Sequence, residues 1–146
     1  MNLLFVCTGN TCRSPMAEGI FRNRIKNDDL LSDIYVSSAG LMTSNGNYAS
    51  KNAVEVCHEH GVDISSHRSR ILTADILSST DLFVCMTFSH ADILMRANVP
   101  KNKIYVLEVS DPYGGDMNIY RQCYEEIEKK LVTLSDLLRE HYGNEL

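Results

Sequence analysis

Short, continuous apolar runs alternate along this chain with longer segments in which apolar residues recur every three or four positions. A continuous apolar run is typical of a strand that is buried on both faces of a parallel sheet. The runs that predict strands are Leu3–Val6, Ile34–Ser38, Asp81–Met86 and Lys103–Leu107. We expect Ala39 and Gly40 to break the second strand after Ser38, because glycine weakens a strand interior.

The segments between these runs have the residue spacing of helices. They are Met16–Ile25, Ala49–His60, Ala74–Leu77, Ser89–Ala97 and about Asp116 to His141. Thr73 is a typical N-cap residue, and Gly61 suits the position that follows a helix. The last helix is expected to bury one apolar stripe that consists of Ile119, Cys123, Ile127, Leu131, Leu134 and Leu138.

Strands that alternate with helices predict an α/β fold with a parallel sheet. The 146 residues contain no linker, repeat or low-complexity tract, so we expect one domain over residues 1–146. The chain is 44% hydrophobic and 23% charged with a net charge of -5, an ordinary soluble composition that indicates no nucleic-acid surface. No apolar stretch has the length of a membrane span, and the N-terminus has no signal-peptide pattern, so no membrane partner is expected.

Five cysteines occur in a chain that has no visible secretion signal. They are Cys7, Cys12, Cys57, Cys85 and Cys123. Reduced thiols and a cytoplasmic location fit this pattern best. The cysteines form no C-x2-C pair and no Cys/His cluster at zinc spacing, so we expect no metal site.

The segment Cys7–Pro15, here called the Cys7 loop, joins the first predicted strand to the first predicted helix. A strand-to-helix turn of this kind presents backbone N–H groups and a helix N-terminus to an anion. The same groups favour a thiolate at Cys7, and the planar fork of Arg13 can hold two phosphate oxygens at once. The pattern therefore predicts a site for phosphoryl transfer to sulfur.

The residues inside the Cys7 loop fit this interpretation. Gly9 allows a positive φ angle, and Asn10 tolerates one better than most residues. Ser14 can cap the helix and could also donate its hydroxyl to the Cys7 sulfur, and Pro15 suits the first helical turn. A Cys and an Arg at this spacing are weak evidence alone, since Cys7 could be a buried thiol at a strand end. The strand, glycine, proline and helix around it favour the site.

A second candidate segment, Ser110–Gly115, follows the fourth predicted strand and is here called the Asp111 loop. Turn chemistry alone would explain its proline and its two glycines. However, the carboxyl ends of parallel strands meet at one edge of a sheet, so this loop and the Cys7 loop can face one crevice. Asp111 could then protonate a leaving group and activate the water that hydrolyses a phosphocysteine. Tyr113 would offer an aromatic wall for a planar substrate side chain.

These motifs resemble those of the low-molecular-weight protein-tyrosine-phosphatase family, and the resemblance covers essentially the whole chain. The matching segments are Val6–Pro15, Ser38–Gly40, Ser65–His67 and Asp111–Tyr113. The resemblance implies a three-layer fold in which helices flank a twisted sheet of four parallel strands. It also implies a mechanism without metal or cofactor, in which Cys7 is the nucleophile, Arg13 the phosphate clamp and Asp111 the acid and then the base.

The resemblance implies further roles in and around the loop. The phosphate-binding residues would be Thr8, Gly9, Asn10, Thr11, Cys12, Arg13 and Ser14. A supporting hydrogen-bond network would consist of Asn10, Ser14, Ser38 and His67. From the sequence alone, His67 is simply an exposed loop histidine. In the family, the residue matching Cys12 can form a reversible disulfide with the nucleophile, which protects it from irreversible oxidation; Cys12 could also be a small apolar filler.

Thr11 is the residue that bears most directly on the substrate. Tyrosine-specific members of the family usually carry Ile there, whereas members that resemble protein-arginine phosphatases carry Thr. A hydroxyl suits a polar guanidinium better than a phenyl face, and the segment Asp111–Asp116 also resembles the arginine branch. Asp116 could add charge near a cationic substrate, or it could simply favour a helix start. We expect phosphorylated protein substrates, with phosphoarginine favoured over phosphotyrosine and inorganic phosphate as the product.

Two other function classes are open at this stage. Thioredoxin-coupled arsenate reductases resemble this chain in the Cys7 loop, but they need two further cysteines close together. Here Cys85 has no partner before Cys123, which argues against such a relay. A non-catalytic phosphate-binding module would keep Arg13 but could dispense with Cys7 or Asp111, and both are present.

Overall fold

The computed structural model describes residues 1–145, so the predicted domain end at residue 146 lies outside the described residues. Within residues 1–145, four parallel strands form one sheet in the order β2-β1-β3-β4. The strands are β1 (Asn2–Cys7), β2 (Tyr35–Gly40), β3 (Leu82–Cys85) and β4 (Ile104–Val106). The predicted α/β fold with a four-stranded parallel sheet is confirmed.

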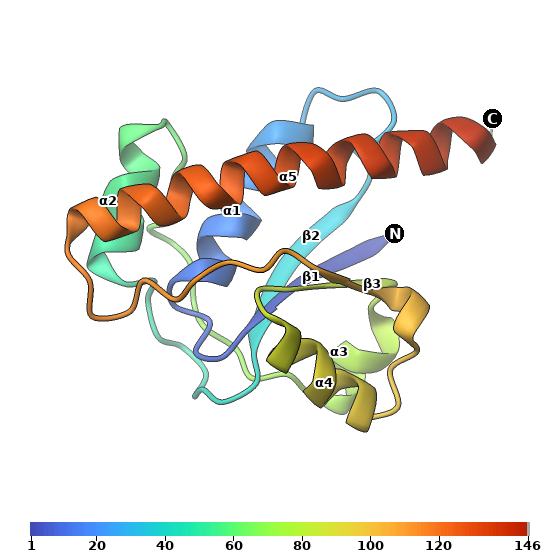
Figure 1. Ribbon diagram of the computed structural model, residues 1–146, viewed down its shortest axis with the longest axis horizontal. Coiled ribbons are helices and arrows are strands. Elements are labelled where there is room, and N and C mark those ends of the chain that lie inside the picture. Colours follow the sequence, from blue (N-terminus) through green and yellow to red (C-terminus); the bar gives the residue numbers. More distant parts are fainter. Residues whose placement is uncertain (146) are drawn as a thin grey trace.

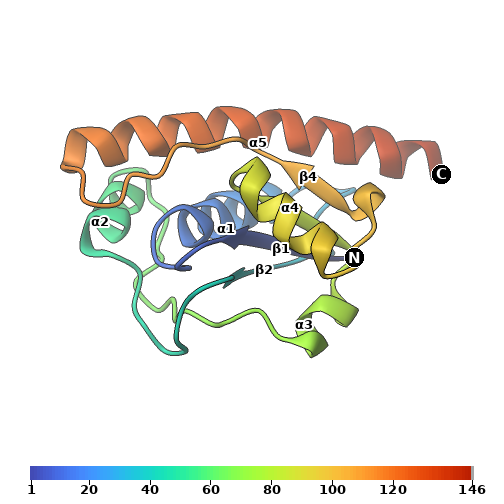
Figure 2. The ribbon, with the colours of Figure 1, turned by 60° about the horizontal axis from the view of Figure 1, so that its bottom comes forward.

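Helices cover both faces of this sheet, as the resemblance implied. They are α1 (Arg13–Ile25), α2 (Lys51–Glu59), α3 (Ala74–Ser79), α4 (Phe88–Arg96) and α5 (Met117–Glu145), with a short 3₁₀ turn, η1, at Lys101–Lys103. The long helix α5 packs on α1 and α2 on one face, whereas α3 and α4 share a core with the other face (Figure 1 and Figure 2). Thr73 caps α3, and Gly61 follows α2 with a φ of 75°, both as predicted.

The central position of β1 explains its unbroken apolar sequence. Side chains alternate between the two faces of a strand, and neighbouring strands lie on both sides of β1. Phe5 and Cys7 therefore belong to the core under α1 and α5, whereas Leu4 and Val6 belong to the core under α4. Cys7 is the last residue of this strand and lies at the carboxyl edge of the sheet.

The expectation that the second strand runs from Ile34 to Ser38 and is then broken by Ala39 and Gly40 is wrong. β2 continues through Gly40, which pairs in register with Cys7 of β1. Glycine is needed there for space, because a Cβ atom on Gly40 would lie 2.8 Å from the carbonyl oxygen of Thr8. Gly40 thus lets β2 approach the start of the Cys7 loop closely, which is one of the recognised uses of glycine in a strand.

The apolar stripe predicted for the last helix is correct except at its first residue. The buried members are Cys123, Ile127, Leu131, Leu134 and Leu138. Ile119 is 44% exposed, and Tyr120 and Tyr124 are buried in its place. Each helical residue turns by about 100°, so Tyr120 continues the buried face at helical spacing and its neighbour Ile119 falls beside it. The helix also continues to Glu145, past the predicted end at His141.

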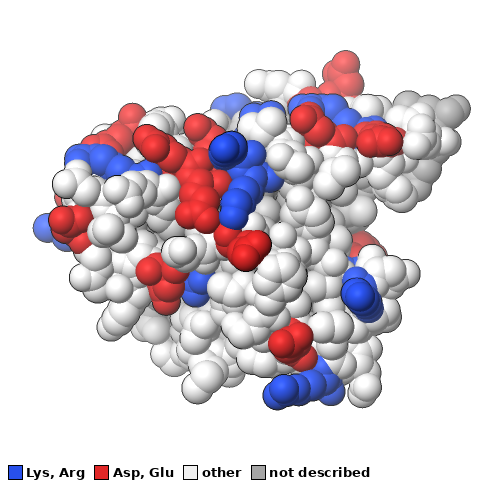
Figure 3. Space-filling model, viewed as in Figure 1, with Lys and Arg blue, Asp and Glu red and all other residues white. Residues whose placement is uncertain are grey.

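Charged side chains of both signs are interspersed on the face that carries α5. In Figure 3, Lys and Arg alternate with Asp and Glu along this helix, and no continuous basic surface covers the face that is drawn. Arg121 pairs with Glu59 across α5 and α2, and Lys130 pairs with Glu126 along α5. Among residues 1–145, none of the helices combines the length and the apolar character that a membrane crossing requires.

Candidate active site

The Cys7 loop takes its shape from an unusual backbone angle at Asn10. Asn10 has a φ of 57°, in the left-handed region that asparagine tolerates. The sequence allowed a positive φ at Gly9 as well, but Gly9 is not among the positive-φ glycines. Asn10 is fully buried, so hydrogen bonds can fix its side chain. This fixation offsets the strain of its left-handed backbone angle.

Helix α1 begins at Arg13, earlier than the predicted start at Met16. Its N-cap residue is Cys12, which makes no side-chain capping bond. The expectation that Ser14 caps the helix is therefore wrong, because Ser14 lies inside the first turn and its hydroxyl faces Cys7. Pro15 lies in the first turn, as predicted. A helix start without a side-chain cap leaves backbone N–H groups free to bind an anion.

Asn10 is the centre of a buried hydrogen-bond network. Its Nδ2 atom donates to Ser14 Oγ at 2.8 Å and to Ser38 Oγ at 3.0 Å. Its Oδ1 atom accepts the backbone N–H of Arg70 at 3.0 Å. Because a backbone N–H can only donate, this contact fixes the orientation of the amide group, and both amide hydrogens are then used by the two serines.

The orientation of Asn10 determines what Ser14 does to Cys7. The Ser14 oxygen accepts from Asn10, so its own hydrogen is available for the Cys7 sulfur, which lies 2.8 Å away. The backbone N–H of Asn10 also donates to this sulfur at 3.2 Å. Two donors therefore point at Cys7, an arrangement that stabilises a thiolate.

The network continues away from the loop through residues that carried no signal in the sequence. Ser38 donates to Glu18 Oε1 at 2.7 Å, and the other oxygen of Glu18 accepts from Arg22 at 2.9 Å. Glu18 and Arg22 are four residues apart on α1, so in the sequence they resemble an ordinary surface ion pair. In the structure, Glu18 and Arg22 extend the hydrogen-bond network from Asn10 and Ser38 along α1.

His67 approaches the same loop from a distant part of the chain. Its Nε2 atom lies 2.8 Å from the carbonyl oxygen of Asn10, so this nitrogen carries a hydrogen and donates it. The carbonyl belongs to the residue with the left-handed backbone angle. His67 is therefore a partner of the loop rather than a free surface histidine.

Arg13 and Asp111 form an ion pair between the Cys7 loop and the Asp111 loop. Arg13 is only 5% exposed, and its Nη1 atom donates to the carbonyl oxygen of Val109 at 2.9 Å. Its Nη2 atom lies 3.6 Å from Asp111 Oδ2. Asp111 is 54% exposed in its side chain, and its other oxygen accepts the backbone N–H of Tyr113 at 3.0 Å. The guanidinium is thus fixed by the protein, while the carboxylate stays open to solvent and substrate.

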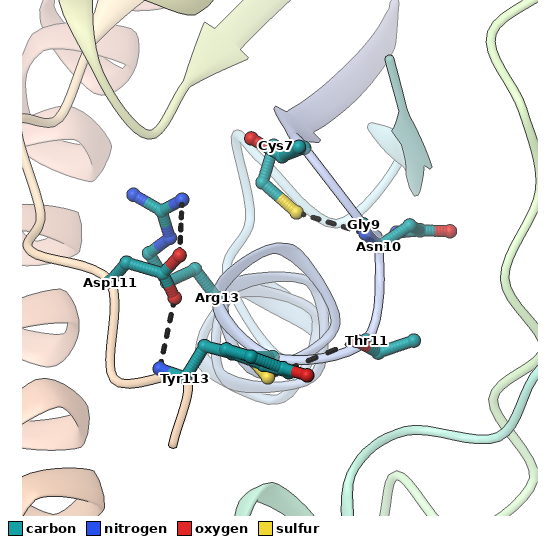
Figure 4. Close-up of a pocket in the computed structure, with 9 residues that line it drawn as sticks. Cys7, Gly9, Asn10, Thr11, Arg13, Asp111 and Tyr113 are labelled. Carbon is teal, nitrogen blue, oxygen red and sulfur yellow. Dashed lines mark hydrogen bonds and ion pairs between the residues drawn. The ribbon is translucent and has the colours of Figure 1, made fainter. Parts of the chain in front are cut away.

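The Cys7 loop and the Asp111 loop share one cavity of about 250 Å³, as the parallel topology predicted. Its lining consists of Cys7, Thr8, Gly9, Asn10, Thr11, Cys12, Arg13, Asp111 and Tyr113. In Figure 4 the sulfur of Cys7 points into the space between the loop and the pair formed by Arg13 and Asp111. This cavity can hold a tetrahedral oxyanion against backbone donors and a guanidinium, with a sulfur nucleophile beside it.

Cys12, which also lines this cavity, belongs to a small polar cluster. Its sulfur is 3.2 Å from the hydroxyl of Tyr120, and the side chain of Ser50 lies beside both. Burial, together with the contact to Cys12, raises the pKa of Tyr120 to about 12. All five cysteines are free thiols in this structure.

The remaining three cysteines belong to the core. Burial raises the pKa of Cys57, Cys85 and Cys123 to about 12. Cys85 and Cys123 lie in the separate cores on the two faces of the sheet. Among residues 1–145, no group of three or more His, Cys, Asp or Glu side chains is placed to hold a metal ion.

His90 is a buried titratable residue beside the cavity that the sequence pattern did not reveal. Its Nε2 atom lies 2.9 Å from the hydroxyl of Thr8, which lines the cavity. Burial lowers the pKa of His90 to about 4; the positive charge of Arg13 acts in the same direction, and the negative charge of Asp111 opposes it. His90 therefore stays neutral over the physiological pH range.

The neutral state of His90 predicts a pH-dependent stability. In the unfolded chain His90 takes up a proton near pH 6.5, but in the folded chain only near pH 4. Between these values the unfolded state binds more protons, so the free energy of unfolding falls as the pH falls, by on the order of 2 kcal/mol. Urea unfolding at pH 7, 6 and 5 measures this change. The free energy of unfolding should fall less steeply with falling pH in the His90→Asn variant than in the unaltered protein. The control is His58→Asn, which changes an exposed histidine and should leave the pH dependence unaltered. If His90→Asn lost stability with falling pH as steeply as this control, His90 would be excluded as the source of the pH dependence.

Comparison with known proteins places this geometry in one family. The family model described as low molecular weight phosphotyrosine protein phosphatase matches residues 2–143. A protein-arginine-phosphatase of Bacillus subtilis is 38% identical over 95% of this chain and 97% of its own length. The structure of a low molecular weight protein tyrosine phosphatase from T. tengcongensis is 40% identical, with a TM-score of 0.86 over 93% of this chain and 98% of that one.

A third similar protein was solved with its active site modified. It is an arginine phosphatase in which the active-site cysteine is replaced by a serine, and this serine is phosphorylated. It is 35% identical to this chain, with a TM-score of 0.88 over 95% of this chain and 96% of its own. The family match spans nearly the whole chain, and the relatives agree with it in sequence and in fold. The chain therefore belongs to the low molecular weight phosphotyrosine protein phosphatase family and is a protein phosphatase.

Proposed function

We propose that this chain hydrolyses phosphoarginine side chains of proteins through a phosphocysteine intermediate. The observation that carries the proposal is the cavity itself, in which the Cys7 sulfur, the fixed guanidinium of Arg13 and the open carboxyl group of Asp111 face one space that Thr11 borders. The products would be the arginine side chain and inorganic phosphate. No step requires a metal or a cofactor.

The first chemical step transfers the phosphoryl group to sulfur. The Cys7 thiolate attacks phosphorus while the bond between phosphorus and the guanidine nitrogen breaks, and Asp111 gives its proton to that nitrogen. Arg13 and the backbone N–H groups of the loop hold the phosphoryl oxygens, which carry the negative charge of the transition state. The hydrogen bond from Arg13 to the Val109 carbonyl fixes the guanidinium before substrate arrives.

The second step restores the enzyme. Asp111, now a carboxylate, takes a proton from a water molecule that attacks phosphorus, and the sulfur–phosphorus bond breaks to release phosphate. The departing thiolate receives the hydrogen bonds of Ser14 and of the Asn10 backbone. The phosphorylated active-site serine in the arginine-phosphatase relative supports such an intermediate at the position of Cys7.

The supporting residues act by holding the loop in shape. Asn10 joins Ser14 to Ser38, and His67 holds the carbonyl of the strained residue. Among the described residues, no buried side-chain nitrogen or oxygen lacks a hydrogen-bond partner, so this polar network is complete. A complete network keeps the donors aimed at the phosphate without reorganisation during the reaction.

The preference for phosphoarginine rests on Thr11 and on the relatives. Thr11 and Tyr113 both line the cavity, Thr11 from the Cys7 loop and Tyr113 from the Asp111 loop, and Tyr113 is 82% exposed. A hydroxyl can accept a hydrogen bond from a guanidinium, whereas it offers little to a phenyl face. Asp116 is not part of this argument, because its carboxylate caps α5 through the N–H of Ile119.

Phosphotyrosine is the second candidate substrate, with the same mechanism. The structure from T. tengcongensis, which is named as a tyrosine phosphatase, is about as similar to this chain as the arginine-phosphatase structure is. The exposed ring of Tyr113 could pack against a phenyl group as well as against a guanidinium. The choice between the two substrates therefore depends on Thr11.

We expect the Thr11→Ile variant to shift the ratio of kcat/KM for phosphoarginine over phosphotyrosine peptides toward phosphotyrosine by about tenfold or more. The aliphatic side chain removes a polar contact and adds apolar surface for a phenyl ring. The Thr11→Ser variant is the matched control, since it keeps the hydroxyl and should keep the preference for phosphoarginine. If the ratio of the two kcat/KM values were unchanged in Thr11→Ile, this side chain would not determine substrate specificity.

The structure also bears on the arsenate-reductase alternative and on redox control. A disulfide relay needs neighbouring thiols, but Cys85 and Cys123 lie on opposite faces of the sheet, and burial raises their pKa to about 12.

Cys12 shares the loop with Cys7, and a reversible disulfide between them would protect the nucleophile. The free thiols throughout the chain support a cytoplasmic location.

A further inference from the structure

We propose that His90 is a positioning residue that fixes the hydroxyl of Thr8 as a hydrogen-bond donor into the active-site cavity, where Thr8 binds a phosphoryl oxygen. This deepens the proposed function, because it adds a side-chain contact to a phosphate site otherwise made by Arg13 and backbone N–H groups. The proposal follows from the hydrogen bonds on the two ring nitrogens of His90.

One ring nitrogen of His90 is a fixed acceptor. His90 is the third residue of α4 and 4% exposed, and its Nδ1 atom receives the backbone N–H of Thr87 at 3.2 Å. The hydroxyl of Thr87 lies 3.0 Å from the same atom. A backbone N–H cannot accept, so Nδ1 must present a lone pair and carries no hydrogen.

The other ring nitrogen is then a donor. A neutral imidazole with an unprotonated Nδ1 carries its hydrogen on Nε2, which lies 2.9 Å from Thr8 Oγ1. The Thr8 oxygen therefore accepts from His90, and the hydrogen of its hydroxyl points away from His90. Protonation of the ring would place a second N–H against the N–H of Thr87, and the nearby charge of Arg13 also opposes it, although Asp111 favours it.

The position of Thr8 decides where the freed hydrogen can go. Thr8 follows Cys7 directly and lines the cavity together with Arg13. Its backbone is held separately, because its carbonyl accepts the N–H of Met42 at 2.9 Å. What His90 adds is the side-chain orientation, and the hydroxyl of an exposed residue that lines the cavity is suited to donate to a phosphoryl oxygen.

Four variants separate the two parts of the proposal. Thr8→Val keeps the side-chain shape without the hydroxyl, and Thr8→Ser restores the hydroxyl. His90→Asn keeps an acceptor for the Thr87 N–H but is too short to reach Thr8, whereas His90→Gln places an amide donor near the original Nε2. The readouts are kcat/KM for para-nitrophenyl phosphate and the inhibition constant of inorganic phosphate. His58→Asn, an exposed histidine on α2, is the control.

We expect Thr8→Val to lose about tenfold or more in kcat/KM and to bind phosphate correspondingly more weakly, while Thr8→Ser stays within about threefold. His90→Asn should lower kcat/KM about fivefold and raise the inhibition constant of phosphate about fivefold, and His90→Gln should recover most of both losses. In the Thr8→Val background, His90→Asn should change nothing further, because both residues act through one hydroxyl.

The proposal would be overturned by unchanged phosphate inhibition in Thr8→Val. An equal loss from His90→Asn with and without the Thr8 hydroxyl would also overturn it, because His90 would then act by another route. Phosphate binding can also be measured by calorimetry, which needs no turnover. If the unaltered protein hydrolysed para-nitrophenyl phosphate no faster than Cys7→Ser, the proposed function would fail, and phosphate binding to the same variants, measured by calorimetry, would still decide the role of Thr8.

Discussion

Replacement of Cys7 by serine is expected to lower turnover by at least about 10⁴-fold while inorganic phosphate binds nearly as tightly as before. A hydroxyl is a far weaker nucleophile than a thiolate, so the first chemical step is lost. Serine fits the 3% exposed site of Cys7 and can accept the hydrogen bonds from Ser14 and the Asn10 backbone. The phosphate-binding shape of the loop should therefore survive.

Turnover of para-nitrophenyl phosphate and calorimetric titration with phosphate measure the two properties separately. Cys57→Ala, which removes a buried thiol on α2, is the matched control and should retain turnover. Joint loss of turnover and phosphate binding would assign Cys7 a structural role. Turnover above about 1% of the unaltered protein would rule out Cys7 as the nucleophile.

The Asp111→Asn variant is expected to lose about 10²- to 10³-fold in kcat on substrates with poor leaving groups, and less than about tenfold on activated aryl phosphates. Only a poor leaving group needs a proton as its bond to phosphorus breaks. The same variant should bind phosphate more tightly, because the carboxylate that lies 3.6 Å from the Arg13 guanidinium no longer repels the anion.

A series of aryl phosphates with graded leaving-group acidity measures this dependence. The rate should become steeper in leaving-group acidity in Asp111→Asn than in the unaltered protein. Asp92→Asn, an exposed carboxylate change on α4, serves as the control for loss of one negative charge. An equal loss of rate across the whole series would remove Asp111 from the acid role.

The β1–α1 connection was predictable because its signals are local. The apolar run, the Cys7 to Arg13 spacing and the proline in the first turn all lie within one stretch of sequence, and the structure places them there. Even here, the sequence pattern did not show which residue carries the left-handed angle. Both Gly9 and Asn10 permit it, and the choice depends on Ser38 and Arg70, which hold the Asn10 side chain from other segments.

Residues that act through tertiary contacts could not be predicted in this way. Glu18 has the spacing of a surface residue on α1, yet it accepts the hydroxyl of Ser38. His90 has the sequence position of a helix capping residue, and only the fold brings it against Thr8. From the sequence, Gly40 is expected to break the strand. Only the structure shows that glycine is needed there because the Thr8 carbonyl lies too close for a side chain. In each case the deciding partner is distant in the sequence.

The central claim is tested most directly by the unaltered protein on two peptides of the same sequence, one with phosphoarginine and one with phosphotyrosine, with Cys7→Ser as the blank. We predict kcat/KM for the phosphoarginine peptide to be at least about tenfold higher, which would match the polar border that Thr11 gives the cavity. A higher value for the phosphotyrosine peptide would contradict the substrate assignment, and turnover no faster than the blank on both peptides would contradict the mechanism.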